Sequence, residues 1–274
     1  MGETTGIAWC HHTFNPWWGC VEVSPGCDDC YARTWALRMG FHLWGHDATR
    51  RFFGDKHWNE PVKWNRVAEA AGERRRVFCA SMADIGEVRS DTVGRELDEA
   101  RERLYALILA TPWLDWLLLT KRPKFYRDLP AAIRALPRVW PGVSVENAEY
   151  TWRLSEMLKV DMAGPPWASY EPAIGPVDWR PFLPGFGYPA GARHALRWLV
   201  IGGESRNRRE PRPFDVQWVR SGIAVCRAAG TAPFVKQFGA WPHDSFGRFS
   251  LADRRAGANP DEWPTDLRVR EFPK

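Results

Sequence analysis

Short apolar runs recur along the chain, and a cluster of polar residues follows each of them directly. The six clearest runs are rich in β-branched and aromatic residues and lie at residues 77–80, 116–119, 139–145, 167–170, 198–201 and 233–235. Runs of this length and composition, each bounded by polar or turn residues, are typical of strands. This repeated pattern limits the folds open to the chain more than any other feature.

The segments between these runs have the character of helices. The clearest lies at residues 93–109, where apolar residues keep near-helical spacing and charged residues occupy the opposite face. Residues 152–158 and 214–229 have the same character. Alternating strands and helices, without long antiparallel hairpins, predict an α/β fold whose parallel sheet closes completely or partly into a TIM-type barrel.

Polar residues at the ends of the expected strands are the candidate site residues. Because the carboxyl ends of parallel strands open onto one face of a barrel, we expect these side chains to converge on a single mouth. Each cluster could instead end a strand or cap a helix, but six of them in register favour a site. The candidates are Ser81, Asp84, Lys121, Arg122, Ser144, Glu146, Glu171, Glu204, Lys236 and Gln237.

Three cysteines crowd into one short segment with the spacing C-x6-C-x2-C, at Cys20, Cys27 and Cys30. The intervening Ser-Pro-Gly can turn the chain so that the three sulfurs face one point. Thiolates bind soft or borderline metals, so the candidates are an iron–sulfur cluster and zinc. Three thiolates leave one iron of a four-iron cluster open to another ligand. A structural zinc site needs a fourth ligand, for which the chain offers Cys10, His11 or His12.

The length and composition are those of a globular protein. The 274 residues, 45% of them hydrophobic and 26% charged, can bury a substantial core. We expect a barrel over residues 1–240 with an insertion near 41–60, followed by a loop-rich tail or lid over 241–274. A formal charge of +5 permits contact with phosphates without marking a dedicated nucleic-acid clamp.

The cysteine usage and the start of the chain indicate the compartment. Six cysteines are too few and too unevenly spread for a disulfide scaffold. The chain has neither a secretion signal nor an apolar run long enough to cross a membrane. We therefore expect a cytoplasmic protein with no membrane partner, in which Cys79 and Cys226 are buried packing residues.

Eight motifs in order carry a family resemblance over about residues 5–241. They are FNPWWGC (14–20), CDDCYA (27–32), SMAD (81–84), LLTKRP (118–123), GVSVEN (142–147), YEP (170–172), GGES (202–205) and KQFG (236–239). With them the chain resembles a family of phage and bacterial proteins usually described only as phage proteins of unknown function, and that family is similar to the radical S-adenosylmethionine (SAM) superfamily. If the chain is phage-encoded, its compartment is the host cell cytoplasm.

The resemblance implies a barrel with the cysteine loop at the C-terminal end of the first strand. It also implies a 4Fe–4S cluster on the three cysteines, with SAM bound to the open iron and cleaved to a 5′-deoxyadenosyl radical. The chain departs from the superfamily pattern in three ways. The usual spacing is C-x3-C-x2-C, Asp29 replaces an aromatic residue before the last cysteine, and Gly-Gly-Glu normally follows the second strand, where this chain has Ser81 and Asp84.

The chemistry of SAM suggests roles for the cofactor-binding candidates. SAM needs an acceptor for its ammonium, a donor for its carboxylate and an acceptor for its ribose hydroxyls. Asp84 suits the first role, and Lys121 or Arg122 suits the second. Ser144 with Glu146 suits the third.

The remaining candidates are assigned to catalysis and substrate. Glu171 and Glu204 could orient substrate or bind the adenine, or they could be structural carboxylates paired with Arg or Lys. Lys236 and Gln237 at the last strand end could meet an anionic substrate. His11 and His12 lie beside the cysteine segment, where one of them could touch SAM or substrate, although we expect both to be solvated loop residues.

These observations favour a radical SAM enzyme of isomerase or lyase type, served by an electron donor such as a flavodoxin or a ferredoxin. The family context and the weak basicity suggest a modified pyrimidine nucleotide in phage DNA as substrate, with isomerisation of an amino-acid adduct on a thymine methyl as one version. The alternatives are a non-catalytic nucleic-acid binding module stapled by zinc and a radical SAM lyase that repairs DNA.

Overall fold

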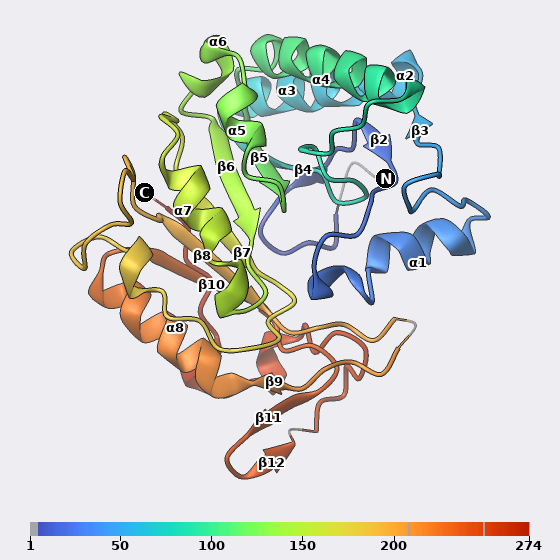
Figure 1. Ribbon diagram of the computed structural model, residues 1–274. Helices are drawn as coiled ribbons and strands as arrows, with labels where there is room; N and C mark the ends of the chain where they lie inside the picture. The colour runs from blue at the N-terminus through green and yellow to red at the C-terminus, as the bar shows by residue number, and fades with distance from the viewer. Residues whose placement is uncertain (1–4, 208, 249, 274) are drawn as a thin grey trace. The chain divides into compact units, whose positions relative to one another are not determined.

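A parallel sheet of seven strands is the central feature of the computed structural model, which describes residues 5–207, 209–248 and 250–273 (Figure 1). Every strand pairing whose register is described within this sheet is parallel. This confirms the α/β class, and the strand order is compatible with a partial TIM-type barrel. In spatial order the strands are β1 (His12–Thr13), β4 (Arg75–Cys79), β5 (Leu114–Thr120), β6 (Val139–Ser144), β7 (Trp167–Tyr170), β8 (Trp198–Gly202) and β10 (Ala232–Gln237).

Helices link most of these strands, as parallel connections require. The sequence correctly predicts α4, α7 and α8, but it misses α1 and α3, whose apolar spacing is weaker. The helices are α1 (Tyr31–Arg38), α2 (Asp55–Trp58), α3 (Glu60–Ala71), α4 (Thr92–Ala110), α5 (Phe125–Asp128), α6 (Ala131–Arg134), α7 (Trp152–Leu158) and α8 (Val216–Ala228).

Capping side chains mark the N-terminal ends of the two longest helices, α4 and α8. The side chain of Asp91 accepts a hydrogen bond from the backbone N–H of Gly94 at the start of α4, and that of Asp215 accepts one from Gln217 at the start of α8. After α8 the chain turns at Gly230, whose φ of +68° only glycine adopts without strain. Local sequence therefore determines where each of these helices begins.

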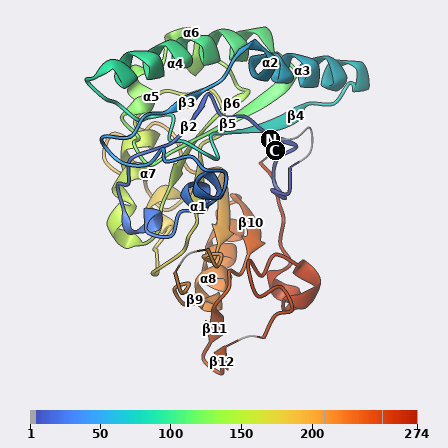
Figure 2. The same ribbon diagram turned by 90° about the vertical axis from the view of Figure 1, so that its right-hand side faces the viewer.

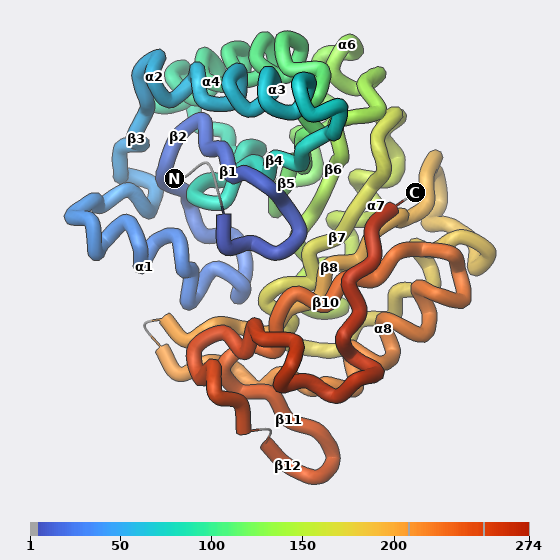
Figure 3. The backbone as a smooth tube through the Cα atoms, turned by 180° about the vertical axis from the view of Figure 1, so that it is seen from behind, coloured from blue at the N-terminus to red at the C-terminus, as the bar shows by residue number. Residues whose placement is uncertain are grey.

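The strands are covered on both faces, which explains why they are continuously apolar. Every residue of β7 and β8 is buried. Helix α8 packs on β8 and β10 (Figure 3), and α3 and α4 lie side by side (Figure 2). Because the strands themselves are buried and apolar, the polar residues that follow them are the clearest candidates for a site.

The chain divides into two compact units, which are described separately below. The first comprises residues 1–23, 32–141 and 162–164, and the second comprises residues 24–31, 142–161 and 165–274. The first unit also holds the antiparallel pair β2 (Trp17–Trp18) and β3 (Arg51–Phe52). The second holds a small sheet of β9 (Phe214–Asp215), β11 (Pro242–Asp244) and β12 (Gly247–Arg248).

The expected insertion near residues 41–60 contains β3 and α2, and a buried arginine organises its loop. The guanidinium of Arg50 donates hydrogen bonds to the carbonyls of Leu43, Gly45, Ala48 and Thr49. It also pairs with Glu87 through two hydrogen bonds of 2.5 and 3.1 Å. These contacts give an otherwise irregular loop a fixed path.

The C-terminal segment is packed more closely than the tail or lid expected from its composition. Trp263 is buried and stacks on Phe238, with ring centroids 4.7 Å apart. The backbone N–H of Val235 in β10 donates a 2.8 Å hydrogen bond to the carbonyl of Val269. The segment thus forms part of the core of the second unit.

Candidate metal and ligand site

The three motif cysteines differ from the other cysteines in their exposure. None of the six cysteines, all of which lie in the described residues, forms a disulfide. Those of the motif are partly exposed, whereas Cys10, Cys79 and Cys226 are buried, which confirms the packing role expected for the last two. The division into units falls within the motif, since Cys20 belongs to the first unit and Cys27 and Cys30 to the second.

In the first unit an arginine that is paired with a carboxylate contacts the sulfur of Cys20 and the backbone of Val21. The guanidinium of Arg122 lies 3.9 Å from Cys20 Sγ and donates a 3.0 Å hydrogen bond to the carbonyl of Val21. The same guanidinium pairs with Asp84 Oδ2 at 2.6 Å. Arg122 follows β5 and Asp84 follows β4, so two strand ends meet the cysteine segment here.

Asp84 is buried and accepts hydrogen bonds from several donors of the first unit. Thr120 Oγ1 and the backbone N–H of Gly86 donate to Oδ1, and the backbone N–H of Lys121 donates to Oδ2. Burial alone would raise the pKa of Asp84, but the charge of Arg122 and these hydrogen bonds outweigh it and hold that pKa below its ordinary value. The same carboxylate helps to raise the pKa of Arg122 against the effect of burial. Asp84 is therefore a fixed negative charge in the folded protein.

Ser81 lies beside an asparagine that the sequence did not mark. Asn15 Nδ2 donates a 3.1 Å hydrogen bond to Ser81 Oγ, and the backbone N–H of Met82 donates a 2.7 Å bond to Asn15 Oδ1. The backbone N–H of Gly19 in turn donates to the carbonyl of Met82 at 3.0 Å. These bonds fasten the residues before Cys20 to the loop after β4.

In the second unit Glu146 follows β6 and contacts the loop that carries Cys27. Ser24 Oγ donates a 2.6 Å hydrogen bond to Glu146 Oε1, and Arg153 donates one of 2.8 Å to Oε2. Arg153 also donates to the carbonyl of Ser144 at 2.9 Å. Both charged side chains are almost completely buried. Ser144 and Glu146, expected at the SAM ribose, thus lie together at the base of the cysteine loop.

Glu204 follows β8 and reaches the same loop through an arginine. The guanidinium of Arg212 pairs with both oxygens of Glu204 and donates a 2.9 Å hydrogen bond to the carbonyl of Pro25. It also lies 3.7 Å from Asp28 Oδ2. The backbone N–H of Arg212 donates a further 2.9 Å bond to Glu204 Oε2. Glu204 is therefore a structural carboxylate paired with an arginine, which was one of its two expected roles.

Glu171 and Lys236 form the remaining charged pair at the strand ends of the second unit. Their side chains lie 2.5 Å apart, and each is about one fifth exposed. Lys236 lies at a register shift between β10 and β8 and is partly exposed, whereas its neighbours Val235 and Gln237 are buried. Gln237 is buried and donates 2.8 Å hydrogen bonds to the carbonyl of Gly203 and to Ser205 Oγ.

The donor chemistry of the motif fits a soft metal, since three cysteines outside any disulfide lie within one short segment. Across residues 5–207, 209–248 and 250–273, no three His, Cys, Asp or Glu side chains are placed to hold a metal ion. His11, one of the possible fourth zinc ligands, uses Nδ1 to accept a 2.8 Å hydrogen bond from the backbone N–H of Arg76. His12, another, stacks on Trp64 with ring centroids 4.4 Å apart.

Sequence reasoning missed the partners of the strand-end acids. Arg153 lies in the first turn of α7 and Arg212 in the loop before β9, and neither follows an apolar run directly. An arginine follows each acid within eight positions, but other arginines stand nearer to Glu204, so the sequence does not single out the partner. Asn15 carries a weaker signal, since it only precedes a proline.

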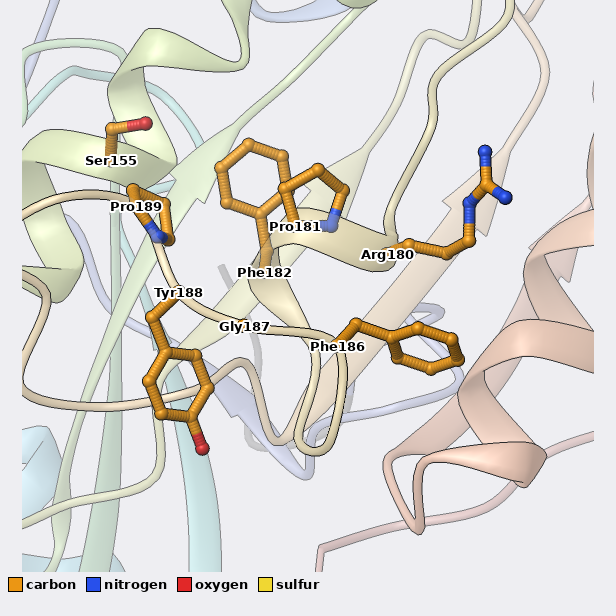
Figure 4. A pocket seen from close by; sticks show the side chains of 8 residues that line it. All are labelled: Ser155, Arg180, Pro181, Phe182, Phe186, Gly187, Tyr188 and Pro189. Carbon is orange, nitrogen blue, oxygen red and sulfur yellow. The ribbon is translucent and has the colours of Figure 1, made fainter.

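A separate surface hollow of the second unit contains none of the predicted site residues (Figure 4). Its volume is about 550 Å³. The ring of Phe182 lies against Pro181, while Phe186 and Tyr188 extend from the loop in different directions. It is lined by Ser155, Arg180, Pro181, Phe182, Phe186, Gly187, Tyr188 and Pro189.

The fold and site define a class of parallel α/β protein that carries three cysteines, none of them in a disulfide, in one short segment beside polar strand ends. Residues 4–265 match the model of a family described as proteins of unknown function, DUF5131, and the chain belongs to that family. No curated protein matches the chain, and no solved structure matches it. None of the helices in the described ranges is both long and apolar enough to cross a membrane.

Proposed function

We propose that this chain is a radical SAM enzyme in which Cys20, Cys27 and Cys30 hold a 4Fe–4S cluster. One observation carries the proposal: the three cysteines of the motif are partly exposed residues outside any disulfide, while the other three cysteines are buried. Three thiolates are the ligand set that leaves one iron of such a cluster open. The parallel sheet supports a partial TIM-type barrel for this chemistry, because sites of that architecture lie at the carboxyl ends of the strands.

When bound, the cluster with SAM supplies one-electron cleavage of the sulfonium and a 5′-deoxyadenosyl radical that abstracts hydrogen from substrate. The protein's own task is to bind and orient the charged groups of its ligands. We assign this task in the second unit to Glu171 and Lys236, which are paired only with each other among the charged partners described and are partly exposed. Glu171 suits an ammonium, and Lys236 suits a carboxylate or a phosphate.

The proposed substrate is a modified pyrimidine nucleotide in DNA. The support is the mild positive charge of +5, which permits phosphate contact, together with the resemblance to phage proteins. Isomerisation of an amino-acid adduct on a thymine methyl is the specific version that we favour, because such an adduct carries the two charges that Glu171 and Lys236 complement. Nucleoside analysis by mass spectrometry, after incubation with modified DNA, distinguishes this reaction from a repair lyase. An isomer keeps the mass of the nucleoside, whereas a lyase releases a fragment.

Anaerobic reconstitution with iron and sulfide tests the enzyme proposal. We expect a brown protein that contains iron and sulfide and that forms 5′-deoxyadenosine from SAM when a reductant is added. Colourless protein that contains zinc and cleaves no SAM would instead support the nucleic-acid binding module.

A matched pair of cysteine variants assigns the cluster to the motif. Cys27→Ala should abolish cluster binding and 5′-deoxyadenosine formation, because a thiolate ligand is lost. Cys226→Ala makes the same chemical change on α8, where the thiol is buried, and should retain both. If Cys27→Ala retains the cluster and the activity, the proposed ligand set is wrong.

A further inference from the structure

The loop that carries Cys27 and Cys30 is held by two buried or nearly buried carboxylates of its own unit. Glu146 accepts a hydrogen bond from Ser24 at the start of this loop. Glu204 pairs with Arg212, which donates to the carbonyl of Pro25. The two acids follow different strands, β6 and β8, and both side chains are 6% exposed or less. The loop is therefore fixed from two sides within the second unit.

The Glu146 side chain lies so close to the loop backbone that position 26 must be a glycine. A Cβ atom placed on Gly26 would lie 2.5 Å from Glu146 Cγ and Oε1, a distance that real Cβ atoms do not reach. Gly26 lies in the one-turn 3-10 helix Pro25–Cys27. The backbone immediately before Cys27 is therefore in close contact with the Glu146 side chain. The position of this carboxylate thus determines the position of the turn.

The end of the loop is fastened separately. Asp29, next to Cys30, is buried and accepts hydrogen bonds from the backbone N–H groups of Asn207 and Arg209 at 3.3 and 3.2 Å. The side chain of Asn207 also donates to the carbonyl of Asp29 at 3.1 Å. The residues before Cys27 and the residue before Cys30 are therefore each held by partners elsewhere in the second unit.

The Glu171–Lys236 pair shows that such contacts are not general at the strand ends. This pair is partly exposed, and among the described residues no hydrogen bond joins it to the cysteine loop. In contrast, Glu146 accepts hydrogen bonds from Ser24 of the loop and from Arg153. Glu204 accepts hydrogen bonds from Arg212, which also donates to the loop. Because the side chains of Glu146 and Glu204 are 6% exposed or less, little of either carboxylate is open to a ribose or a substrate.

We propose that Glu146 and Glu204 are positioning residues that hold Ser24–Cys30 in the shape in which Cys27 and Cys30 receive metal. The identity of the metal in this inference rests on the proposed function. The fixing of the loop by the two acids does not depend on that function. It replaces the expectation that these two acids contact SAM or substrate. Outer residues that orient ligands typically change metal affinity about 10- to 100-fold when they are removed.

Hydrogen–deuterium exchange of the full-length, metal-free protein tests the fixing of the loop. In Glu146→Gln and Glu204→Gln we expect exchange of the peptide covering residues 20–30 to accelerate about tenfold or more, since local opening becomes easier. The matched control is Asp115→Asn, which breaks a pair with Arg74 that touches no residue of the loop. Unchanged exchange in both glutamate variants overturns the proposal.

A milder variant covers the case in which a glutamate variant does not fold. Arg212→Lys keeps the charge but loses the planar guanidinium that reaches Glu204 and Pro25 together. Because Arg212 is partly exposed, the fold should survive, and exchange should accelerate in the same peptide. A Glu204→Asp variant that restores slow exchange supports a positioning role, and slow exchange in Arg212→Lys contradicts it.

Reconstitution with iron measures metal binding, which separates a positioning role from a general loss of stability. At an unchanged midpoint of thermal unfolding, Glu204→Gln should bind about 10- to 100-fold less tightly to iron and should alter the electron paramagnetic resonance signal of the reduced protein. Wild-type iron binding and an unaltered signal in this variant overturn the positioning role. If the wild type itself takes up no iron, the proposed function fails, while the exchange experiment still decides whether the two acids fix the loop.

Discussion

Ser24 Oγ donates a 2.6 Å hydrogen bond to Glu146 Oε1, although 122 positions separate the two residues in the sequence. Ser24 begins the turn that leads to Cys27, and Glu146 follows the end of β6. The acceptor is itself paired with Arg153 in a buried ion pair. The path of the cysteine loop is therefore coupled to the integrity of a charged pair in the core.

Gly26→Ala should weaken this coupling directly. The added methyl group would overlap the Glu146 side chain, so we expect a loss of about 1–3 kcal/mol in the free energy of unfolding. Urea denaturation measures this loss, and iron uptake should fall in parallel. Gly54→Ala is the control, because no atom lies within 4 Å of a Cβ at that position. Equal stability of the two variants would show that the loop moves away from Glu146 without cost.

Arg153→Met alone should destabilise the protein more than removal of both charges of the Glu146–Arg153 pair. The single change leaves the buried Glu146 carboxylate without its countercharge, which costs about 3–5 kcal/mol, whereas Glu146→Gln with Arg153→Met leaves no buried charge. Urea denaturation of the single and double variants measures the difference. Breaking the exposed pair of Asp178 with Arg180 by Arg180→Met should leave stability unchanged. A double variant that is no more stable than Arg153→Met would contradict this account.

Arg122→Met should lower the reduction potential of a cluster bound through Cys20. The guanidinium places a positive charge and N–H donors beside Cys20 Sγ, and both favour the more negative, reduced state of the cluster. A redox titration followed by electron paramagnetic resonance measures the potential. Arg127→Met removes an exposed charge on α5 and should have little effect. A potential that is unchanged or higher in Arg122→Met would contradict a role for this arginine.

Lys236→Met should weaken ligand binding without loss of iron. A charge-assisted hydrogen bond to an anionic group contributes about 1.5–3 kcal/mol, so KM for SAM or for the nucleotide substrate should rise about tenfold or more. The control is Lys159→Met, which removes the charge of an exposed pair with Glu156. If both variants keep the wild-type KM values, Lys236 does not contact a ligand.

The stability of the protein should fall as pH drops from about 6.5 to about 4, and His11 contributes to this loss. Burial and then the charges of Arg76, Arg75 and His12 lower the pKa of His11 from 6.5 to about 4. The unfolded chain binds a proton in this window and the folded chain does not, so acid favours unfolding. Since His11 is only partly buried, we expect an effect on the order of 1 kcal/mol.

His11→Asn tests this pH dependence. Asparagine keeps an acceptor for the backbone N–H of Arg76 but does not titrate. Urea denaturation at about pH 7 and about pH 4.5 should therefore show a smaller loss in this variant than in the wild type. His42→Asn, at an exposed position, should retain the wild-type loss. Equal losses in all three proteins would exclude His11 as a contributor.

The sequence by itself determined six of the seven strands of the main sheet, the helices α4, α7 and α8, and the cysteine motif. Buried strands are short apolar runs, and amphipathic helices repeat at a fixed period, so each leaves a local pattern. The run at residues 198–201, for example, is β8 almost residue for residue. The polar residues after the runs were also found correctly, because a strand that leaves the core must end in polar chain.

Only the tertiary structure decided what those polar residues contact. Glu146 and Glu204 have the same local setting as Glu171, yet the first two hold the cysteine loop and the third pairs with Lys236. The partners lie on other strands, in loops or on a later helix, and their distances depend on the path of the whole backbone. Charge pairing acts through space, whereas strand and helix patterns act along the chain, and this is why the arginines beside each acid could not be assigned from the sequence.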